Sequence, residues 1–299
     1  MVHCRERGAE LYLGEDAHMI IHEQGGTAQI AGVSISPIPN NPDGTFNLET
    51  VRKRLRNPMN VHDPISRMIA VENTINGKVV PFVWLRDVVK FAKEHGLKLH
   101  MDGARIWQAA VATSTDVKDW VAGFDSVTFC LSKMGAPVGS MLCGSKEFIF
   151  QARRVRKVLG GAMRQVGVLA AAGLVVLDDL PSKLAEDQRR ARSMAKMINS
   201  LESSIFRVDP LDAQTNMVWV SVKDTGSVNA MKFAERLGKI EDDDEDDQVK
   251  VLAWQALSSK IRICFHINIT DELAAAAERK VRYVIKKMDP KFENLTIHG

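Results

Sequence analysis

The stretch Leu97-Lys-Leu-His-Met-Asp-Gly-Ala-Arg-Ile-Trp-Gln-Ala-Ala-Val-Ala-Thr113 decides the fold of this chain. Its first five residues predict a short strand, and residues 106–113 predict a helix. Asp102 lies between them, where a strand of a parallel sheet leads into the helix that crosses back over the sheet. The stretch therefore indicates an α/β protein.

The neighbouring segments repeat this alternation. Arg67-Met-Ile-Ala-Val71 predicts a buried strand, and a helix predicted over residues 84–96 ends at a glycine, which favours helix ends. Strands over residues 126–131 and 138–143 and a helix over residues 146–158 continue the series. Strands separated by helices of this length predict right-handed crossovers and a mostly parallel sheet flanked by helices.

The pattern changes after Pro181. A helical stretch over residues 163–180 and a helix over residues 183–200 lead into a mixed region. Predicted strands cover residues 215–222, 249–254 and 260–265, and predicted helices cover residues 228–237 and 271–287, the last with Thr270 as its N-cap. We therefore expect two domains, a large one over residues 1–181 and a smaller C-terminal α+β domain over residues 182–299.

The composition excludes several classes of function. The chain has 299 residues, and its net charge of +3 is too small to favour nucleic acid or an anionic membrane. No apolar run reaches the ~20 residues of a membrane helix, and the acidic run over residues 241–247 predicts a solvated loop. Four widely spaced cysteines and histidines without metal-ligand spacing predict no disulfide framework, no metal site and a reducing, cytoplasmic location.

Charged side chains follow two of the predicted strands at their carboxyl ends. Asp102 and Arg105 follow one strand, and Lys133 follows the next. Ligands of open parallel sheets bind at this edge, so these side chains are expected to converge on a site. Taken alone the signal is weak, because an aspartate here commonly caps a helix and a lone lysine is usually on the surface.

Longer sequence words around these residues point to one family. The words are Gly14-Glu-Asp-Ala-His18, Glu23-Gln-Gly-Gly26, Glu72-Asn-Thr-Ile-Asn-Gly-Lys-Val-Val-Pro81, His100-Met-Asp-Gly-Ala-Arg-Ile-Trp-Gln-Ala-Ala110, Ser126-Val-Thr-Phe-Cys-Leu-Ser-Lys133, Gly135-Ala-Pro-Val-Gly-Ser140 and Arg156-Lys-Val-Leu-Gly-Gly-Ala-Met-Arg-Gln165. Together they closely resemble the low-specificity threonine aldolases, with a resemblance that thins after about residue 180.

The resemblance implies a fold and an activity. The fold would be that of the fold-type-I transferases that depend on pyridoxal 5'-phosphate (PLP), as in aspartate aminotransferases. The activity would be that of a lyase that splits L-threonine or L-allo-threonine into glycine and acetaldehyde, in threonine catabolism and glycine biosynthesis. Family members are commonly homotetramers, so a small amino-acid substrate and copies of the same chain are the expected partners.

The resemblance also implies cofactor-binding residues. Lys133 would hold PLP covalently, since a partly desolvated lysine is a usable nucleophile. Asp102 would pair with the pyridine nitrogen and keep the ring an electron sink. His18 would stack on the ring and take part in catalysis, although a turn residue is the alternative. Arg164 would reach a phosphate, of this or a neighbouring subunit.

Two arginines would bind the substrate. Arg262, in Lys260-Ile-Arg-Ile-Cys-Phe-His266, matches the family arginine that holds the substrate carboxylate, for which a guanidinium fork is suited. Arg105 would contact the same carboxylate or the cofactor. The alternative for Arg262 is an ordinary surface residue of a strand.

Three departures from the family pattern keep other functions open. The chain starts late relative to the family, so the turn that binds the PLP phosphate is expected to be missing. The lysine word is one residue shorter, Ser132-Lys-Met-Gly135, and Ile75 replaces a histidine expected near the substrate hydroxyl. The alternatives are a catalytically impaired or non-catalytic form and another PLP-dependent reaction on β-hydroxy amino acids.

Overall fold

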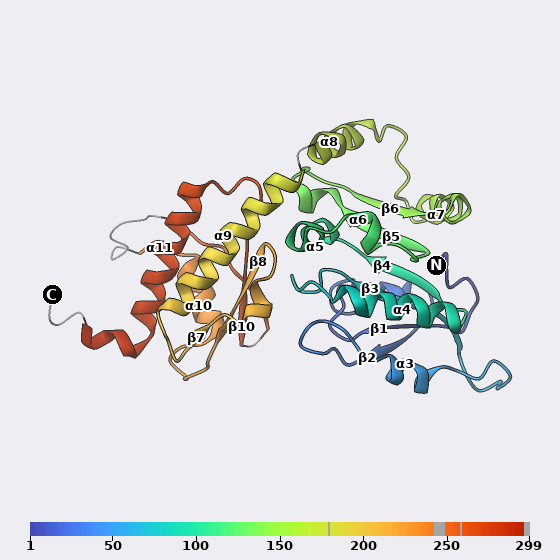
Figure 1. The fold of residues 1–299 in the computed structure, drawn as a ribbon, viewed down its shortest axis with the longest axis horizontal. Helices are drawn as coiled ribbons and strands as arrows, with labels where there is room; N and C mark the ends of the chain where they lie inside the picture. Colours follow the sequence, from blue (N-terminus) through green and yellow to red (C-terminus); the bar gives the residue numbers. More distant parts are fainter. Residues whose placement is uncertain (179, 242–248, 258, 296–299) are drawn as a thin grey trace. The chain divides into compact units, whose positions relative to one another are not determined.

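The computed structural model describes residues 1–178, 180–241, 249–257 and 259–295 (Figure 1). The chain divides into two compact units, Met1–Leu180 and Pro181–Gly299. The domain boundary predicted from the sequence lies next to this division. The prediction that the larger unit binds a cofactor is separate from this division.

The larger unit is built on a six-stranded sheet, counted over the described residues, in the order β2-β1-β3-β4-β5-β6. Its strands are β1 (Ala9–Gly14), β2 (Ser34–Ile38), β3 (Ile65–Glu72), β4 (Lys98–Asp102), β5 (Ser126–Cys130) and β6 (Ser140–Gly144). Neighbouring strands from β2 to β5 pair in parallel, whereas β6 runs antiparallel to β5. This mostly parallel sheet with its helices confirms the predicted fold class.

Helices cover the sheet of the larger unit. They are α1 (His18–Ile21), α2 (Gly26–Gln29), α3 (Leu48–Arg54), α4 (Phe82–Glu94), α5 (Ile106–Thr113), α6 (Val117–Trp120), α7 (Lys146–Val158) and α8 (Gly167–Asp178), with a 3-10 helix at Leu131–Met134. In α4, Leu85, Val88 and Ala92 recur at helical spacing and are buried against the sheet. The α5 and α7 bounds match the predicted ranges.

The core of the larger unit explains why these elements assemble. Tyr12, Ile69, Leu99 and Trp120 are almost fully buried in one apolar cluster between the sheet and its helices. At about 25 cal/mol per Å² of apolar surface removed from water, such burial supplies most of the stability of the unit.

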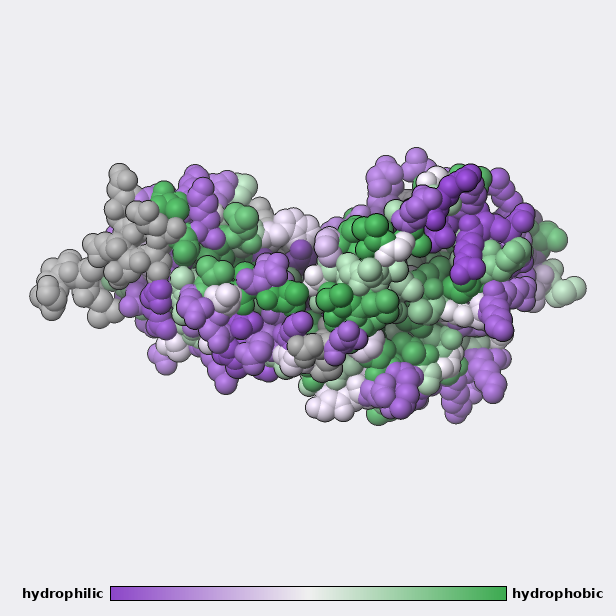
Figure 2. Space-filling view, turned by 90° about the horizontal axis from the view of Figure 1, so that it is seen from above, coloured by the Kyte–Doolittle hydropathy of each residue, from purple (hydrophilic) through white to green (hydrophobic). Residues whose placement is uncertain are grey.

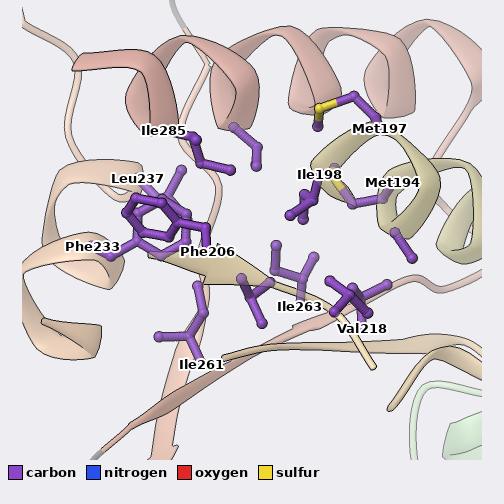
Figure 3. Close-up of a cluster of buried hydrophobic side chains, with 14 of the residues drawn as sticks. Met194, Met197, Ile198, Phe206, Val218, Phe233, Leu237, Ile261, Ile263 and Ile285 are labelled. Carbon is purple, nitrogen blue, oxygen red and sulfur yellow. The ribbon is translucent and has the colours of Figure 1, made fainter. Parts of the chain in front are cut away.

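The smaller unit has a four-stranded antiparallel sheet in the order β7-β8-β10-β9. Its elements are α9 (Leu180–Ser200), β7 (Phe206–Arg207), a 3-10 helix at Pro210–Ala213, β8 (Met217–Val222), α10 (Ala230–Leu237), β9 (Trp254–Leu257), β10 (Lys260–Cys264), α11 (Asp271–Met288) and a 3-10 helix at Pro290–Leu295. Figure 3 shows Phe206, Phe233 and Ile285 between the helices and the sheet, in the core of this unit.

Two features of the smaller unit test the sequence predictions. Thr270 caps α11 as predicted, because its Oγ1 accepts a hydrogen bond from the backbone N–H of Leu273. The strand predicted over residues 249–254 is wrong, because the strand begins at Trp254. Val251 is buried and donates its backbone N–H to the carbonyl of Leu237, so this segment packs against the end of α10.

Other predictions have mixed outcomes. The strands β1 and β2 were not predicted; β2 is an edge strand that contains Pro37, a residue that weakens a strand pattern. Leu131, predicted as the end of a strand, begins the 3-10 helix that carries Lys133. The predicted acidic loop falls mostly outside the described residues. No helix among the described residues is both long and apolar enough to span a membrane.

Candidate functional site

Two acidic residues end neighbouring parallel strands. Glu72 is the last residue of β3, Asp102 is the last residue of β4, and the two are paired in register. The backbone N–H of Asn73 donates to the carbonyl of Asp102 at 2.9 Å, which continues the pairing past the strand ends. Two carboxyl groups therefore stand side by side at the sheet edge where ligands of such folds bind.

A tight junction holds Asp102 in place. Oδ1 of Asp102 accepts a hydrogen bond from the backbone N–H of Ala104 at 3.1 Å. A Cβ on Gly103 would lie 2.7 Å from the carbonyl oxygen of Thr128, so only glycine fits between β4 and β5 here. The backbone then turns through Arg105, the N-cap residue of α5. Arg105 and Asp102 are thus set by one short loop.

Lys133 reaches the same region from the next strand. It lies in the 3-10 helix that follows β5, is exposed, and precedes Gly135 at φ 110°. Burial raises the pKa of the nearby Cys130 thiol; the charge of Lys133 opposes this shift, Asp102 adds to it and Arg105 opposes it. The backbone N–H of Cys130, at the end of β5, donates to the carbonyl of Ala104 at 3.4 Å, so the segments that carry Asp102, Arg105 and Lys133 adjoin each other.

Glu72 is held in an unusual electrostatic environment. Burial is the main cause that raises its pKa to about 8, and the carboxylate of Asp102 raises it further. A hydrogen bond from the backbone N–H of His18 and the charge of Arg105 act in the opposite direction, and Asp16 adds to the rise. At neutral pH Glu72 is therefore mostly protonated.

His18 enters the site from the end of β1. It is the first residue of α1, and its backbone N–H donates to Oε2 of Glu72 at 2.7 Å. Its imidazole is exposed, with Nδ1 3.0 Å from Oε1 of Glu23 and its ring 5.0 Å from the ring of His22. The loop before it is close-packed, since a Cβ on Gly14 would lie 2.4 Å from the amide oxygen of Asn40.

Two buried polar atoms without partners follow the end of β3. Among the described residues, Nδ2 of Asn73 and Oγ1 of Thr74 are buried and make no hydrogen bond. Buried donors in this state cost about 1–3 kcal/mol each unless a ligand or water completes them. Ile75, one residue further, is only 4% exposed and packs under the turn at Gly44, so its side chain belongs to the core.

The residues of this edge fit PLP. The cofactor needs an amine, a carboxylate for its pyridine nitrogen and an aromatic ring against its face. Lys133, Asp102 and His18 offer these three groups in one unit, and Asn73, whose Nδ2 is buried without a partner, is joined to Asp102 through the backbone. Lys133, Asp102, His18 and Arg105 are thus the residues that would hold it.

Two predicted residues lie on other segments of the chain. Arg164 lies in the exposed loop between α7 and α8. Arg262 belongs to β10 of the smaller unit, where its guanidinium carbon lies 4.4 Å from the ring centre of Trp254 and 5.8 Å from that of Trp219. Their roles remain predictions.

Sequence reasoning missed Glu72 and Asn73 as functional residues. Both follow directly after the predicted strand 67–71, at the kind of strand end that singled out Asp102. The position of Glu72 at a carboxyl strand end was therefore the signal. Its neighbour Asp102 lies on another strand, so the pairing itself was not visible.

A separate cavity of about 790 Å³ lies in the larger unit. Its lining includes Leu11, Met68, His100 and Phe148, and none of the six predicted site residues. Burial lowers the pKa of His100 to about 4, and its Nδ1 lies 2.7 Å from Oγ of Ser126. Most of the side chains that line this cavity are apolar, and Arg153 and Arg156 also line it.

Comparisons with known proteins match the chain to one family model and to several relatives. The family model of β-eliminating lyases matches residues 1–223. The chain is 38% identical over 275 residues to low-specificity L-threonine aldolase 1 of Arabidopsis thaliana, covering 90% of this chain and 74% of that protein. It is 40% identical over 234 residues to the low specificity L-threonine aldolase of Escherichia coli (strain K12), covering 78% and 67%.

Solved structures give the same fold. The threonine aldolase of Leishmania major superposes with a TM-score of 0.75 at 18% sequence identity, covering 96% of this chain and 80% of that one. At this identity the likeness concerns the fold alone.

Proposed function

The chain belongs to the β-eliminating lyase family, among the low-specificity L-threonine aldolases, and we propose that it cleaves L-threonine and L-allo-threonine to glycine and acetaldehyde. It is a PLP-dependent lyase. The single observation that carries the proposal is that the segments after the paired strands β4 and β5, which hold Asp102, Arg105 and Lys133, are joined by the hydrogen bond from the Cys130 N–H to the carbonyl of Ala104.

Each predicted site residue has its own role in this reaction. Lys133 would hold the cofactor covalently through its side-chain amine. When bound, the cofactor supplies an electron sink for the bond that breaks. The Asp102 carboxylate would pair with the pyridine nitrogen and keep it protonated. The imidazole of His18 would contact the cofactor ring and limit its orientation.

The proposed cleavage of the substrate consumes no second reactant. The Cα–Cβ bond of the substrate breaks, the β-hydroxyl group loses its proton and becomes the aldehyde carbonyl, and Cα gains a proton to give glycine. Arg262 binds the substrate carboxylate, and Arg105 binds the same carboxylate or the cofactor. The side chain of Ile75 has no group that can accept a proton, so another group accepts the proton of the substrate hydroxyl.

A labelling experiment tests the proposal. The purified chain is incubated with PLP, reduced with borohydride, digested and mapped by mass spectrometry, while acetaldehyde release from L-threonine is followed in parallel. We expect the label on Lys133, and we expect Lys133→Ala to lose both label and at least about 10³-fold in turnover. Lys146→Ala, at the exposed start of α7, is the matched control and keeps both. Label on another lysine with Lys133 unmodified contradicts the assignment.

The assembly and location belong to the same proposal. Self-association, to a tetramer as in the family, is supported by the apolar and mostly exposed helix α8. Arg164 lies next to this helix in sequence and is the residue we assign to a phosphate, of this or a neighbouring subunit. The four cysteines are free, which suits a reducing compartment such as the cytoplasm.

A further inference from the structure

Glu72 connects two segments of the site that are far apart in the sequence. Its Oε2 accepts the backbone N–H of His18 at 2.7 Å, and its strand position is paired with Asp102. One segment therefore carries the ring expected against the cofactor, and the other carries the carboxylate expected at its nitrogen. Glu72 is the residue that touches the first and neighbours the second.

The hydrogen bond from the His18 N–H to Glu72 replaces an N-cap, which the residue before α1 does not supply. The first N–H groups of a helix have no partner within the helix. The residue before α1 is Ala17, whose side chain makes no capping hydrogen bond. The carboxyl group of Glu72, from β3, takes that place for His18. The start of α1 is thus fixed by a tertiary contact.

We propose that Glu72 is a positioning residue of the site, which ties the His18 backbone to the sheet edge at Asp102 and so fixes the His18 ring relative to the cofactor. This inference rests on the proposed function for its catalytic consequence. Its structural part, the attachment of α1, is independent of any activity.

The charges around Glu72 favour this role. It faces Asp102 from β4, Arg105 from the N-cap of α5, and Asp16 and the His18 N–H from the loop and helix after β1. Burial and the two acidic neighbours raise its pKa to about 8. In the protonated form Glu72 still accepts a hydrogen bond but adds no second negative charge beside Asp102. Asp102 then remains the carboxylate available to a pyridine nitrogen.

Three substitutions distinguish the role of Glu72 as a hydrogen-bond acceptor from the role of its charge. Glu72→Gln keeps an acceptor oxygen and is neutral. Glu72→Leu removes the acceptor at similar volume, and Glu72→Ser, which is polar but too short to reach His18, replaces it where the leucine variant does not fold. Glu10→Gln is the control, because Glu10 is a buried, hydrogen-bonded carboxylate near the amino end of β1, away from this edge.

The first readout is amide hydrogen exchange of His18 in the cofactor-free protein. We expect exchange about tenfold faster in Glu72→Leu or Glu72→Ser than in the wild type, because one hydrogen bond is lost. We expect Glu72→Gln and Glu10→Gln to stay within about threefold of the wild type.

The second readout is PLP affinity by absorbance titration, with steady-state kinetics on L-threonine. In the variants without the acceptor, we expect the dissociation constant of PLP to rise about tenfold and kcat to fall more than KM rises, since orientation is what is lost. Glu72→Gln is expected to restore both.

Two outcomes overturn the inference. The first is that the variants without the acceptor match the wild type both in the amide exchange of His18 and in PLP affinity. The other is a Glu72→Gln variant as impaired as Glu72→Leu, which would assign the effect to the carboxyl proton or charge. A wild type that binds PLP but does not cleave threonine refutes the proposed function alone, because the exchange readout does not depend on activity.

Discussion

The guanidinium group of Arg262 is held between two indole rings. The strand register places Arg262 opposite Trp219 on β8 and Trp254 on β9. Its guanidinium carbon lies 5.8 Å and 4.4 Å from the respective ring centres. Each such contact contributes roughly 0.5–1 kcal/mol at an exposed site. A guanidinium held in this way keeps a planar fork suited to a carboxylate.

Replacing Arg262 with lysine tests this fork. An ammonium group stays charged but cannot make two parallel hydrogen bonds, so we expect Arg262→Lys to raise KM for L-threonine about tenfold. We expect Trp254→Leu to raise it by less, about threefold, since one of two ring contacts is lost. Steady-state kinetics measure both, and a KM unchanged in Arg262→Lys counts against a carboxylate-binding role.

Glu72 makes stability depend on pH. Its pKa in the folded chain is about 8, above its ordinary value of 4.5, so the folded protein binds the proton more tightly than the unfolded chain. The stability from this group is fully present below pH 4.5 and is lost as pH rises to about 8. Solvent screening limits the loss to roughly 2 kcal/mol.

Urea unfolding of the cofactor-free protein at pH 5, 7 and 9 measures this loss. We expect the free energy of unfolding of the wild type, relative to Glu72→Gln, to fall over this range by roughly 2 kcal/mol. A difference that stays constant with pH means that Glu72 is ionised throughout and contradicts the raised pKa.

At the scale of elements, the junction between β4 and α5 sets the spacing of the site. Gly103 directly follows β4, and its backbone N–H donates to the carbonyl of Thr128, in β5, at 2.9 Å. A Cβ there would also lie 3.1 Å from Cβ of Ile106, in α5. Strand, helix and neighbouring strand therefore meet at a position that admits no side chain.

Gly103→Ala is expected to destabilise the larger unit. The added methyl group meets backbone and a packed side chain, neither of which can move freely, so we expect a loss of about 2–3 kcal/mol and weaker PLP binding. Gly167→Ala, at the start of α8 with open space around it, is the matched control and is expected to be neutral or slightly stabilising. Equal stability of the two variants in urea would refute the close packing.

At the scale of the whole molecule, the larger unit exposes apolar side chains on several of its elements. Hydrophobic residues are visible on this unit in the space-filling view (Figure 2). Exposed apolar side chains gather along β6, α7 and α8, among them Met141, Leu142, Phe150, Val168, Leu174 and Val175. In α8 apolar residues surround the helix, and an apolar surface of this kind is commonly buried by association.

Charged substitutions in α8 test that association. Val168 is 78% exposed and Leu174 66% exposed, so Val168→Asp with Leu174→Asp should leave the fold of one chain intact. We expect sedimentation velocity to show a smaller species than the wild type, because burying a carboxylate costs several kcal/mol. Leu252→Asp, at a site 84% exposed in the smaller unit, is the control. A wild type that sediments as a monomer refutes the proposal.

The local sequence determined much of the secondary structure. Helices over residues 106–113 and 146–158 and the cap at Thr270 were predictable, because helix periodicity and capping act within a few residues. The strand predicted over residues 249–254 failed since Val251 is buried through a tertiary contact with the end of α10. Apolar character says that a residue is buried, but it does not say against which element.

The site, too, was determined partly by local sequence and partly by tertiary structure. The words around Asp102 and Lys133 were enough to predict the family, the cofactor and the edge of the sheet where these residues lie. Only the tertiary structure placed Glu72 beside Asp102 and against the His18 backbone. Parallel pairing joins strands that a whole helix separates along the chain, so no local pattern encodes which strand ends meet. The raised pKa of Glu72 follows from that meeting, because burial and a neighbouring carboxylate act through space.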